Sequence, residues 1–257
     1  MNAAFEVGAA ALRADQRALE IHANNVANVN TPAFKRTDAR FSEVLSRQVN
    51  AADGADVSAN GLAPEGGGVR VVPQTTLFSQ GSLKPTGNAL DLAIDGLGLI
   101  ELIGASGDPV LWRGGTLRVN EDGLLATSSG LPLRVGIIVP QDAEALTIAP
   151  DGVVSVRTAT EEAFEIGQIG LVRTDHEGGL ERLDNGLFRA AAETRLIDAR
   201  PGEDGVGALV QGSIEESNVE LTAEMVGMLM IQRAFAANAQ IVQAADQIAA
   251  ITNNLKG

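Results

Sequence analysis

Apolar residues recur at alternating spacings of four and three near the C-terminus, and this pattern restricts the chain more than any other feature. Ten positions follow it without one polar residue among them. The pattern is the a/d repeat of a helix that packs against other helices, and it predicts a helix roughly 50 Å long at about 1.5 Å per residue. We name these residues the C-terminal stripe: Ala223, Gly227, Met230, Ala234, Ala237, Ile241, Ala244, Ile248, Ile251 and Leu255.

The same segment carries a second band of apolar residues between those of the stripe: Met228, Ile231, Phe235 and Val242. A helix with two apolar faces needs more than one partner. We expect the C-terminal stripe to pack on an N-terminal helix of the same chain. The second band is then left for neighbouring molecules.

The N-terminal segment has a shorter repeat of the same kind. Its predicted a/d positions are Phe5, Leu12, Leu19 and Val26, with Ala9, Gln16 and Ala23 four residues after the first three. Thr31-Pro32 should stop this helix, because proline lacks the amide hydrogen and moves its predecessor out of the α region.

The exit of this helix, "HANNVANVNTPAFKR" at 22–36, is unusually rich in asparagine. An amide side chain can donate and accept hydrogen bonds at once, so it suits helix ends that are buried between molecules. We expect that role for Asn24 and Asn25, and for Asn238 on the C-terminal helix. A capping or turn role is the alternative for Asn28 and Asn30, and we favour it for Asn30.

These patterns define one expected interface. The residues predicted at helical subunit contacts are Phe5, Leu12, Leu19, Val26, Asn24, Asn25, Gly227, Met228, Met230, Ile231, Ala234, Phe235, Ala237, Asn238, Ile241, Val242 and Ile248.

The middle of the chain has a different texture. Short alternating runs such as "LDLAI" and "GVVSV" are separated by Asx-Gly pairs, for example at 95–96 and 122–123. Such pairs supply the positive φ angles of tight hairpins, so we predict ten or more short antiparallel strands. The fold class is α+β, with paired terminal helices in a coiled-coil-like domain (1–32 and 215–257), a linker or extended loop (33–68) and a central β domain (69–214).

A weak internal repeat marks the two ends of the β region. "FSQGSL" at 78–83 and "LVQGSI" at 209–214 share a core of three letters, and two such strands are candidates for pairing with each other. Chance similarity is the alternative.

Composition excludes several function classes. The formal net charge of −14 disfavours nucleic acid, and only 3% of the residues are aromatic, which disfavours sugar binding. "TDHEGG" at 174–179 could offer Asp175, His176 and Glu177 to a metal ion, but a glycine turn explains it better. We therefore expect no catalytic, metal or cofactor site and no small-molecule substrate.

Three motifs in order along the chain resemble one known family. "ANNVANVNTPAFKR" is similar to the N-terminal signature of flagellar axial proteins, which is usually NNxANxxTxGFK. "LDLAIDGLGLIEL" and "VNEDGLLATSSGLPL" resemble their central-domain motifs, and "QGSIEESNVELTAEMVGMLMIQRAFAANAQIVQAADQI" resembles their C-terminal signature. The likeness covers nearly the whole chain.

The resemblance implies a structural subunit of the basal-body rod, the shaft that carries motor torque to the hook. Within the family the chain is most similar to distal-rod members, with proximal-rod members as the alternative. The implied partners are copies of itself, other rod subunits and hook protein at the ends, surrounding ring proteins and the flagellar type III export apparatus. The implied location is the basal body in the cell envelope, from periplasm to outer membrane, reached without a cleaved signal peptide.

The chain also departs from the family pattern. Ala33 stands where the family usually has Gly, Leu99-Ile100 replace an aromatic pair, and Phe235 replaces a Tyr. "LWRGG" at 111–115 stands where Tyr-Thr-Arg-Asp-Gly is usual. The competing function classes are a secreted β-rich binding or adhesive protein with helical arms and a hydrolase built on the β region.

Overall fold

The computed structural model describes residues 2–44, 68–74, 79–159, 162–175, 179–183, 186–203 and 205–254. These residues form two helices and many antiparallel strands in several small sheets, which confirms the predicted α+β class with a central β region. The chain divides into two compact units. The helical unit comprises residues 2–26, 38–44, 68–74 and 221–254, and the β unit comprises the other described residues.

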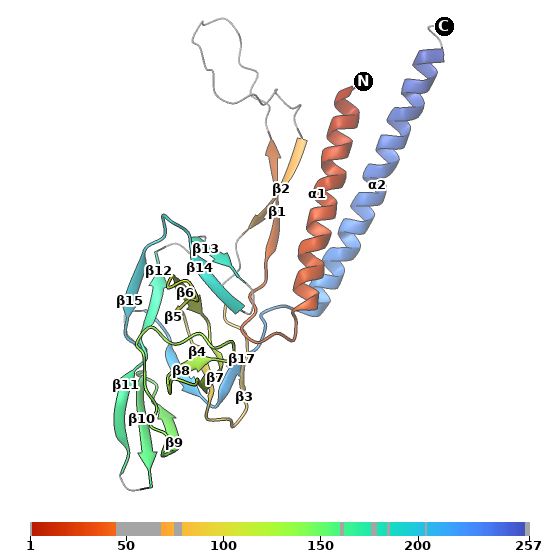
Figure 1. Ribbon diagram of the computed structural model, residues 1–257. Coiled ribbons are helices and arrows are strands. Elements are labelled where there is room, and N and C mark those ends of the chain that lie inside the picture. The colour runs from red at the N-terminus through yellow and green to blue at the C-terminus, as the bar shows by residue number, and fades with distance from the viewer. Residues whose placement is uncertain are drawn as a thin grey trace, which may run out of the picture. The chain divides into compact units, whose positions relative to one another are not determined.

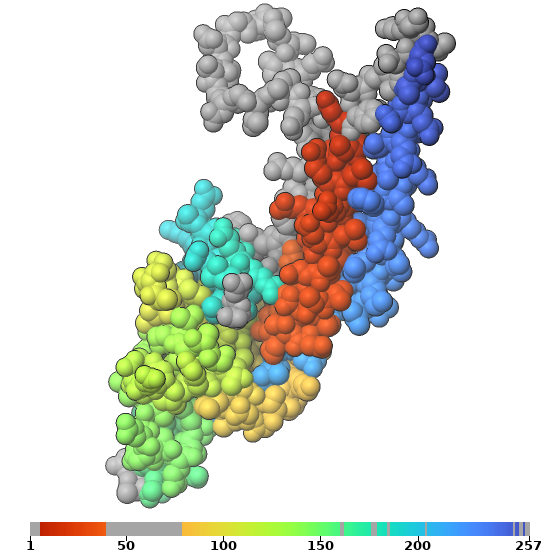
Figure 2. Space-filling model, turned by 45° about the vertical axis from the view of Figure 1, so that its right-hand side comes forward, coloured from red at the N-terminus to blue at the C-terminus, as the bar shows by residue number. Residues whose placement is uncertain are grey.

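The helical unit contains the two predicted helices. Helix α1 spans Asn2–Ala27 and helix α2 spans Leu221–Asn254. They lie side by side with opposite chain directions (Figure 1), and their atoms are in contact in the space-filling view of Figure 2 as well. Neither helix is long and apolar enough to cross a membrane.

A two-stranded hairpin also belongs to the helical unit. Strand β1 (Asp38–Val44) pairs antiparallel with β2 (Gly68–Gln74), with Asp38 opposite Gln74 and Val44 opposite Gly68. Strand β1 lies inside the segment 33–68 that we expected to be a linker; residues 45–67 of that segment lie outside the described residues. The glycine-rich composition of the expected linker applies to its second half, whereas β1 has a regular partner in the "VRVV" run of β2.

The β unit is made of short strands. Its first eight are β3 (Leu83–Pro85), β4 (Asp91–Asp95), β5 (Ile100–Ile103), β6 (Pro109–Trp112), β7 (Gly115–Val119), β8 (Leu125–Thr127), β9 (Ala143–Ile148) and β10 (Val153–Thr158). The others are β11 (Phe164–Gln168), β12 (Leu171–Thr174), β13 (Leu180–Arg182), β14 (Leu187–Ala190), β15 (Leu196–Ala199), β16 (Ala208–Gln211) and β17 (Ser213–Glu215). The expectation of ten or more antiparallel strands is confirmed.

The strands join in several small sheets. Two have four strands, in the orders β16-β4-β7-β8 and β13-β14-β6-β5, and one has three, in the order β11-β10-β9. The pairs β12-β15 and β17-β3 complete the described β unit. Asx-Gly pairs occupy the predicted turns: Gly123 has φ 78° and Gly152 has φ 90°. At Gly152 a Cβ would also lie 2.2 Å from the Ile169 carbonyl oxygen, so both angle and space require glycine there.

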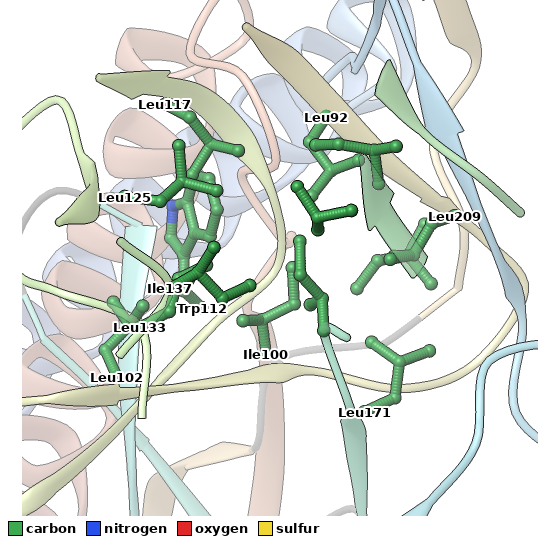
Figure 3. Packing of buried hydrophobic residues seen from close by; sticks show 14 of the residues in the cluster. Leu92, Ile100, Leu102, Trp112, Leu117, Leu125, Leu133, Ile137, Leu171 and Leu209 are labelled. Atoms are coloured by element: carbon green, nitrogen blue, oxygen red, sulfur yellow. The ribbon is translucent and has the colours of Figure 1, made fainter. Parts of the chain in front are cut away.

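Alternate residues of the central strands face two different hydrophobic clusters. Ile100 and Leu102 of β5 point into the larger cluster, together with Trp112 of β6 (Figure 3). Their neighbours Leu99 and Leu111 point to the opposite side, into a small cluster with Val172, Leu180 and Phe188. The sheet is therefore buried on both faces. Leu99 and Ile100, which replace an aromatic pair of the family, each fill one of the clusters.

The strands at the two copies of the internal repeat pair with each other, but no described residue of one copy lies opposite a residue of the other. Strand β3 lies antiparallel to β17, with Leu83 opposite Glu215, and the Glu216 amide donates to the Ser82 carbonyl at 2.8 Å. The glutamine of each copy bridges neighbouring segments: Gln80 bonds Asp95 and the Gly96 amide, and Gln211 bonds three backbone groups of residues 89, 146 and 148. The prediction that the two copies pair with each other is therefore wrong: Leu83 lies opposite Glu215, just beyond the second copy, and the 209–211 part of that copy pairs with β4.

We predict that Leu125→Ala lowers the free energy of unfolding of the β unit by about 3 kcal/mol, because it leaves a cavity beside fully buried neighbours. Trp112, the one tryptophan of the chain, lies in the same cluster and reports unfolding by its fluorescence in a urea titration.

The matched control is Val119→Ala. Val119 lies directly opposite Leu125 in the β7-β8 pair but is 43% exposed. The substitution should therefore lower the free energy of unfolding by only about 0.5 kcal/mol. Equal losses for the two variants would contradict the assigned core.

Candidate subunit-interface surface

The buried face of α1 is not the predicted one. The inner side of the helix follows spacings of three and four through Gly8, Ala11, Asp15, Ala18, His22 and Asn25, with the buried Ala14 next to it. The predicted d positions Ala9, Gln16 and Ala23 are exposed, whereas Leu12, Leu19 and Val26 are half-buried at the border of the buried face. The helix is therefore rotated about its axis relative to the expectation, and its inner face is made of small and polar residues.

The face of α2 that meets α1 is also different from the one expected. A Cβ added at Gly8 would lie 3.9 Å from the Val242 Cβ, Asn238 donates to an Asp15 carboxylate oxygen at 2.7 Å, and the His22 Nδ1 lies 2.5 Å from a Glu224 carboxylate oxygen. The inner positions of α2 thus run through Glu224, Met228, Ile231, Asn238 and Val242, which include the second band. The expectation that the C-terminal stripe packs on α1 within the chain is wrong.

The described residues of the C-terminal stripe, apart from Gly227, lie on the outside of the helical unit instead. Met230 is 68% exposed, Ile241 58% and Ile251 60%. Large exposed apolar side chains of this helix form what we call the outer α2 surface: Met225, Val226, Leu229, Met230, Ile241, Ile248 and Ile251. An apolar surface of this length on one helix marks a site for another protein surface.

The other residues predicted at subunit contacts fall on both faces. Ala234 and Ala237 are exposed beside the outer α2 surface, and Phe235 is 39% exposed at the border of the inner face. Asn24 is exposed at the end of α1. The side chain of Phe5 lies outside the described residues.

Gly227 has an unexpected role on the inner side. A Cβ there would lie 2.7 Å from the His22 Cε1 atom, so only glycine leaves room for the imidazole against the α2 backbone. Asn25 is fully buried and donates to the same Glu224 carboxylate oxygen at 3.1 Å. The amide of Asn25 therefore serves a contact within the chain, rather than the contact between chains that we expected.

The turn after α1 explains another asparagine. The Thr31 amide donates to the Asn28 carbonyl at 3.1 Å, and the Thr31 hydroxyl donates to the Asn28 side-chain oxygen at 3.2 Å. Helix α1 has already ended at Ala27. Asn28 thus has the turn role that we considered as the alternative.

In the β unit, the segment that follows this turn docks on a buried carboxylate. Glu215 of β17 is 1% exposed and forms ion pairs with Lys35 and Arg113. The Arg113 Nε lies 2.8 Å from one of the Glu215 carboxylate oxygens. The Gly81 amide donates to the other oxygen at 2.8 Å. The backbone carbonyl of Glu215 accepts from the Ala33 amide at 2.7 Å. One residue thus joins four segments of the chain.

The two cations of this network are buried as well. Lys35 is fully buried and also donates to the Ser79 carbonyl at 2.9 Å. Arg113, 3% exposed, donates to the carbonyl oxygens of Gly98 at 2.6 Å and Gly96 at 2.5 Å. Burial lowers the pKa of Lys35 below its ordinary 10.5, and the hydrogen bond and charge of Glu215 oppose that shift.

Neighbours of Lys35 complete the docking of the segment 33–36. Phe34 is buried under the guanidinium of Arg182, 3.7 Å from the ring centre. The Arg36 amide donates to the Asn218 side-chain oxygen at 2.6 Å, and the Asn218 amide nitrogen donates to the Ser79 carbonyl at 3.0 Å. The sequence did not predict this network, because Lys35 and Glu215 are 180 residues apart and neither carries a local signal of burial.

The structure offers little to the competing function classes. A cavity of about 110 Å³ in the β unit is lined by Leu97, Leu99, Val172 and Leu180 beside Arg113. Ligand pockets usually enclose about 300–1,000 Å³. Among the described residues no group of three or more His, Asp or Glu could hold a metal ion, and His176 and Glu177 lie outside the described residues.

The described residues thus form a helical unit that exposes an apolar surface on α2 and a β unit of small sheets. Three family models match the chain: "Flagella basal body rod protein" over 5–35, "Flagellar hook protein FlgE/F/G D1 domain" over 93–156 and "Flagellar basal body rod FlgEFG protein C-terminal" over 210–255.

Full-length relatives agree with these matches. The chain is 34% identical to the flagellar basal-body rod protein FlgG of Caulobacter vibrioides, over 98% of this chain and 99% of the relative. It is 33% identical to the FlgG of Bacillus subtilis, over 97% of each, and 30% identical to the rod protein FlgF of Caulobacter vibrioides, over 94% and 93%. The chain belongs to the family of flagellar basal-body rod proteins and is a structural rod subunit of the flagellum.

We predict that Glu215→Gln lowers the free energy of unfolding of the β unit by about 3–5 kcal/mol, because it leaves two buried cations without a counter-charge. Urea titration followed by Trp112 fluorescence measures the loss. The control is Glu216→Gln at the next position, where the ion pair with Lys84 is exposed and the expected change is below about 1 kcal/mol. A loss no larger at 215 than at 216 would show that the buried network does not hold the unit together.

A second prediction concerns pH. The pKa of Lys35 is lowered in the folded chain, so between that pKa and 10.5 the unfolded chain binds more protons, and the stability from this group rises with pH. Below the lowered pKa, Lys35 is charged in both states, and the full cost of burying its charge reduces the stability of the folded chain. The free energy of unfolding of the parent, relative to that of Lys35→Met, should therefore rise as the pH approaches 10.5 from below.

The control for this experiment is Lys84→Met, which removes a lysine that is largely exposed. Its pH profile should run parallel to that of the parent. A parallel profile for Lys35→Met would mean that burial does not lower the pKa of Lys35.

Proposed function

We propose that the chain is a distal-rod subunit that polymerises helically through the outer α2 surface and so forms part of the shaft that transmits torque to the hook. The FlgG-named relatives at 33–34% identity support the distal position, and the FlgF relative at 30% makes the proximal rod the alternative. The observation that carries the proposal is the row of exposed apolar side chains along α2.

In this proposal the two ends of the chain form the polymerisation domain. Residues 1–32 and 215–257 pair as a coiled-coil-like element, the segment 33–68 connects it, and the central domain 69–214 is the outer part of the shaft. The contacts of Asp15 with Asn238 and of His22 with Glu224 support the pairing of the helices. The small residues beside the outer α2 surface, such as Ala234 and Ala237, let a neighbouring helix approach closely.

The energetics favour apolar contacts between copies. Burying one large apolar side chain completely is worth roughly 1.5–3 kcal/mol, and the outer α2 surface offers seven of them. The net charge of −14 makes identical copies repel one another. Attraction between copies must therefore come from the apolar surface.

The family indicates the surroundings of such a subunit. We propose contacts with copies of itself, with other rod subunits and hook protein at the ends of the rod, with the surrounding rings and with the type III export apparatus. The proposed location is the basal body in the cell envelope, between periplasm and outer membrane, and export needs no cleaved signal peptide. The role is structural, without a catalytic site or a cofactor.

We predict that Ala237→Glu abolishes polymerisation, because a carboxylate in the middle of an apolar contact between helices is buried without a partner. Electron microscopy of the concentrated protein, scored for helical filaments or tubes, measures the loss, and swimming of cells that carry the variant gives a second readout.

Gln243→Glu is the matched control, since it adds the same charge to the same helix at an exposed polar position. It should assemble like the parent, and both proteins should keep the fluorescence of Trp112. Normal filaments and swimming with Ala237→Glu would show that the outer α2 surface is not the contact face.

A further inference from the structure

Helix α2 turns the less apolar of its two faces toward α1. The C-terminal stripe has no polar residue among its ten positions, yet its described residues other than Gly227 lie outside. The inner face includes a glutamate and an asparagine, Glu224 and Asn238. Apolar burial alone would favour the opposite arrangement. Some other interaction must decide which face of α2 is turned inward.

The inner face of α1 supplies that interaction. It carries Asp15, which is 5% exposed, the half-buried His22 and the fully buried Asn25. Each of these has a polar partner on the inner face of α2: Asp15 binds Asn238, and both His22 and Asn25 bind Glu224. Three polar side chains of α1 thus meet two polar side chains of α2.

The opposite arrangement would lose every one of these bonds. If α2 turned its apolar stripe inward, Asp15, His22 and Asn25 would face Met, Ile and Ala side chains and would be buried without hydrogen-bond partners, which is strongly unfavourable. Steric fit acts in the same direction, because Gly227 gives room to His22 and Gly8 gives room to Val242 in the observed arrangement.

We propose that the polar residues Asp15, His22 and Asn25 select the face of α2 that α1 covers, and thereby keep the apolar C-terminal stripe on the outside. They are specificity-determining residues for the pairing of the two helices. The use of the outer stripe by neighbouring copies rests on the proposed function above, but the choice of face is a property of the single chain.

Disulfide trapping tests the choice directly, since the chain contains no cysteine. Gly8→Cys combined with Val242→Cys reports the observed pairing, because the two Cβ positions are 3.9 Å apart, within the usual range for a disulfide of about 3.5–4.5 Å. Gly8→Cys combined with Ile241→Cys reports the opposite arrangement, because Ile241 belongs to the exposed stripe.

The measured quantity is the equilibrium constant of each intramolecular disulfide against glutathione, in dilute protein. We expect the constant for position 242 to exceed that for position 241 at least tenfold. The same two cysteine pairs are then placed in a protein that also carries Asp15→Ala, His22→Ala and Asn25→Ala, substitutions that leave α2 unchanged. In that protein the ratio of the 242 constant to the 241 constant should fall at least tenfold. The constant for position 241 should stay the same or rise.

The control background replaces three exposed residues of α1, with Gln16→Ala, Arg17→Ala and Glu20→Ala, and should keep the ratio of the parent. An unchanged ratio after loss of the three inner polar residues would overturn the proposal. A ratio near one in the parent would also overturn it, because neither face of α2 would then be preferred. An equal fall of both constants would overturn it as well, because the polar contacts would then hold the helices together without selecting a face.

This readout is independent of assembly. If Ala237→Glu assembled normally, the proposed contact between copies would be wrong, but the ratio of the two disulfides in the single chain would be unaffected. If instead the ratio did not respond to the inner polar residues, the selection of the face would be wrong while the assembly results stood.

Discussion

The β unit depends on one buried carboxylate. Glu215 holds Lys35, Arg113 and the Gly81 amide with its side chain and the Ala33 amide with its backbone, so it joins four segments that are far apart in the sequence. A buried cation that loses its partner is strongly destabilising, which makes the arrangement all-or-none. Arg113 directly follows Trp112, a member of the main hydrophobic cluster. The docking of residues 33–36 and the packing of the core are therefore coupled through one strand end.

The helical unit distributes its polar groups in an unusual way. A helix pair in water normally buries apolar residues and exposes polar ones. Here Asp15, Asn25 and Glu224 are buried between the helices, and large apolar side chains such as Met230 and Ile241 are exposed. This distribution is unfavourable for an isolated molecule in water. It becomes reasonable under the proposed function, in which neighbouring subunits of the shaft cover the exposed apolar surface.

The sequence predicted which elements exist more reliably than how they pack. Heptad spacing identified both helices, and alternating runs with Asx-Gly pairs identified the β region, because these signals are local. The face of α2 could not be predicted, since two apolar bands share one period and only the polar groups of a distant helix distinguish them. The pairing of Lys35 with Glu215 spans 180 residues, and neither residue carries a local signal of burial. The strand pairs β16-β4 and β14-β6 also join segments that are distant in the sequence, whereas the hairpin β7-β8 follows from its turn.

The position of Ala33 shows how the buried network tolerates a departure from the family. The family usually has glycine there, and Ala33 indeed has a positive φ of 55°, which costs an alanine about 1–2 kcal/mol. The strain persists because the residue is fixed on both sides: its own amide bonds the Glu215 carbonyl, and Phe34 and Lys35 after it are buried. The Ala33 methyl group is itself buried, which returns part of the cost. The turn is therefore maintained by its anchors rather than by the conformational freedom of glycine, and so the chain can carry the family signature with alanine in its most constrained position.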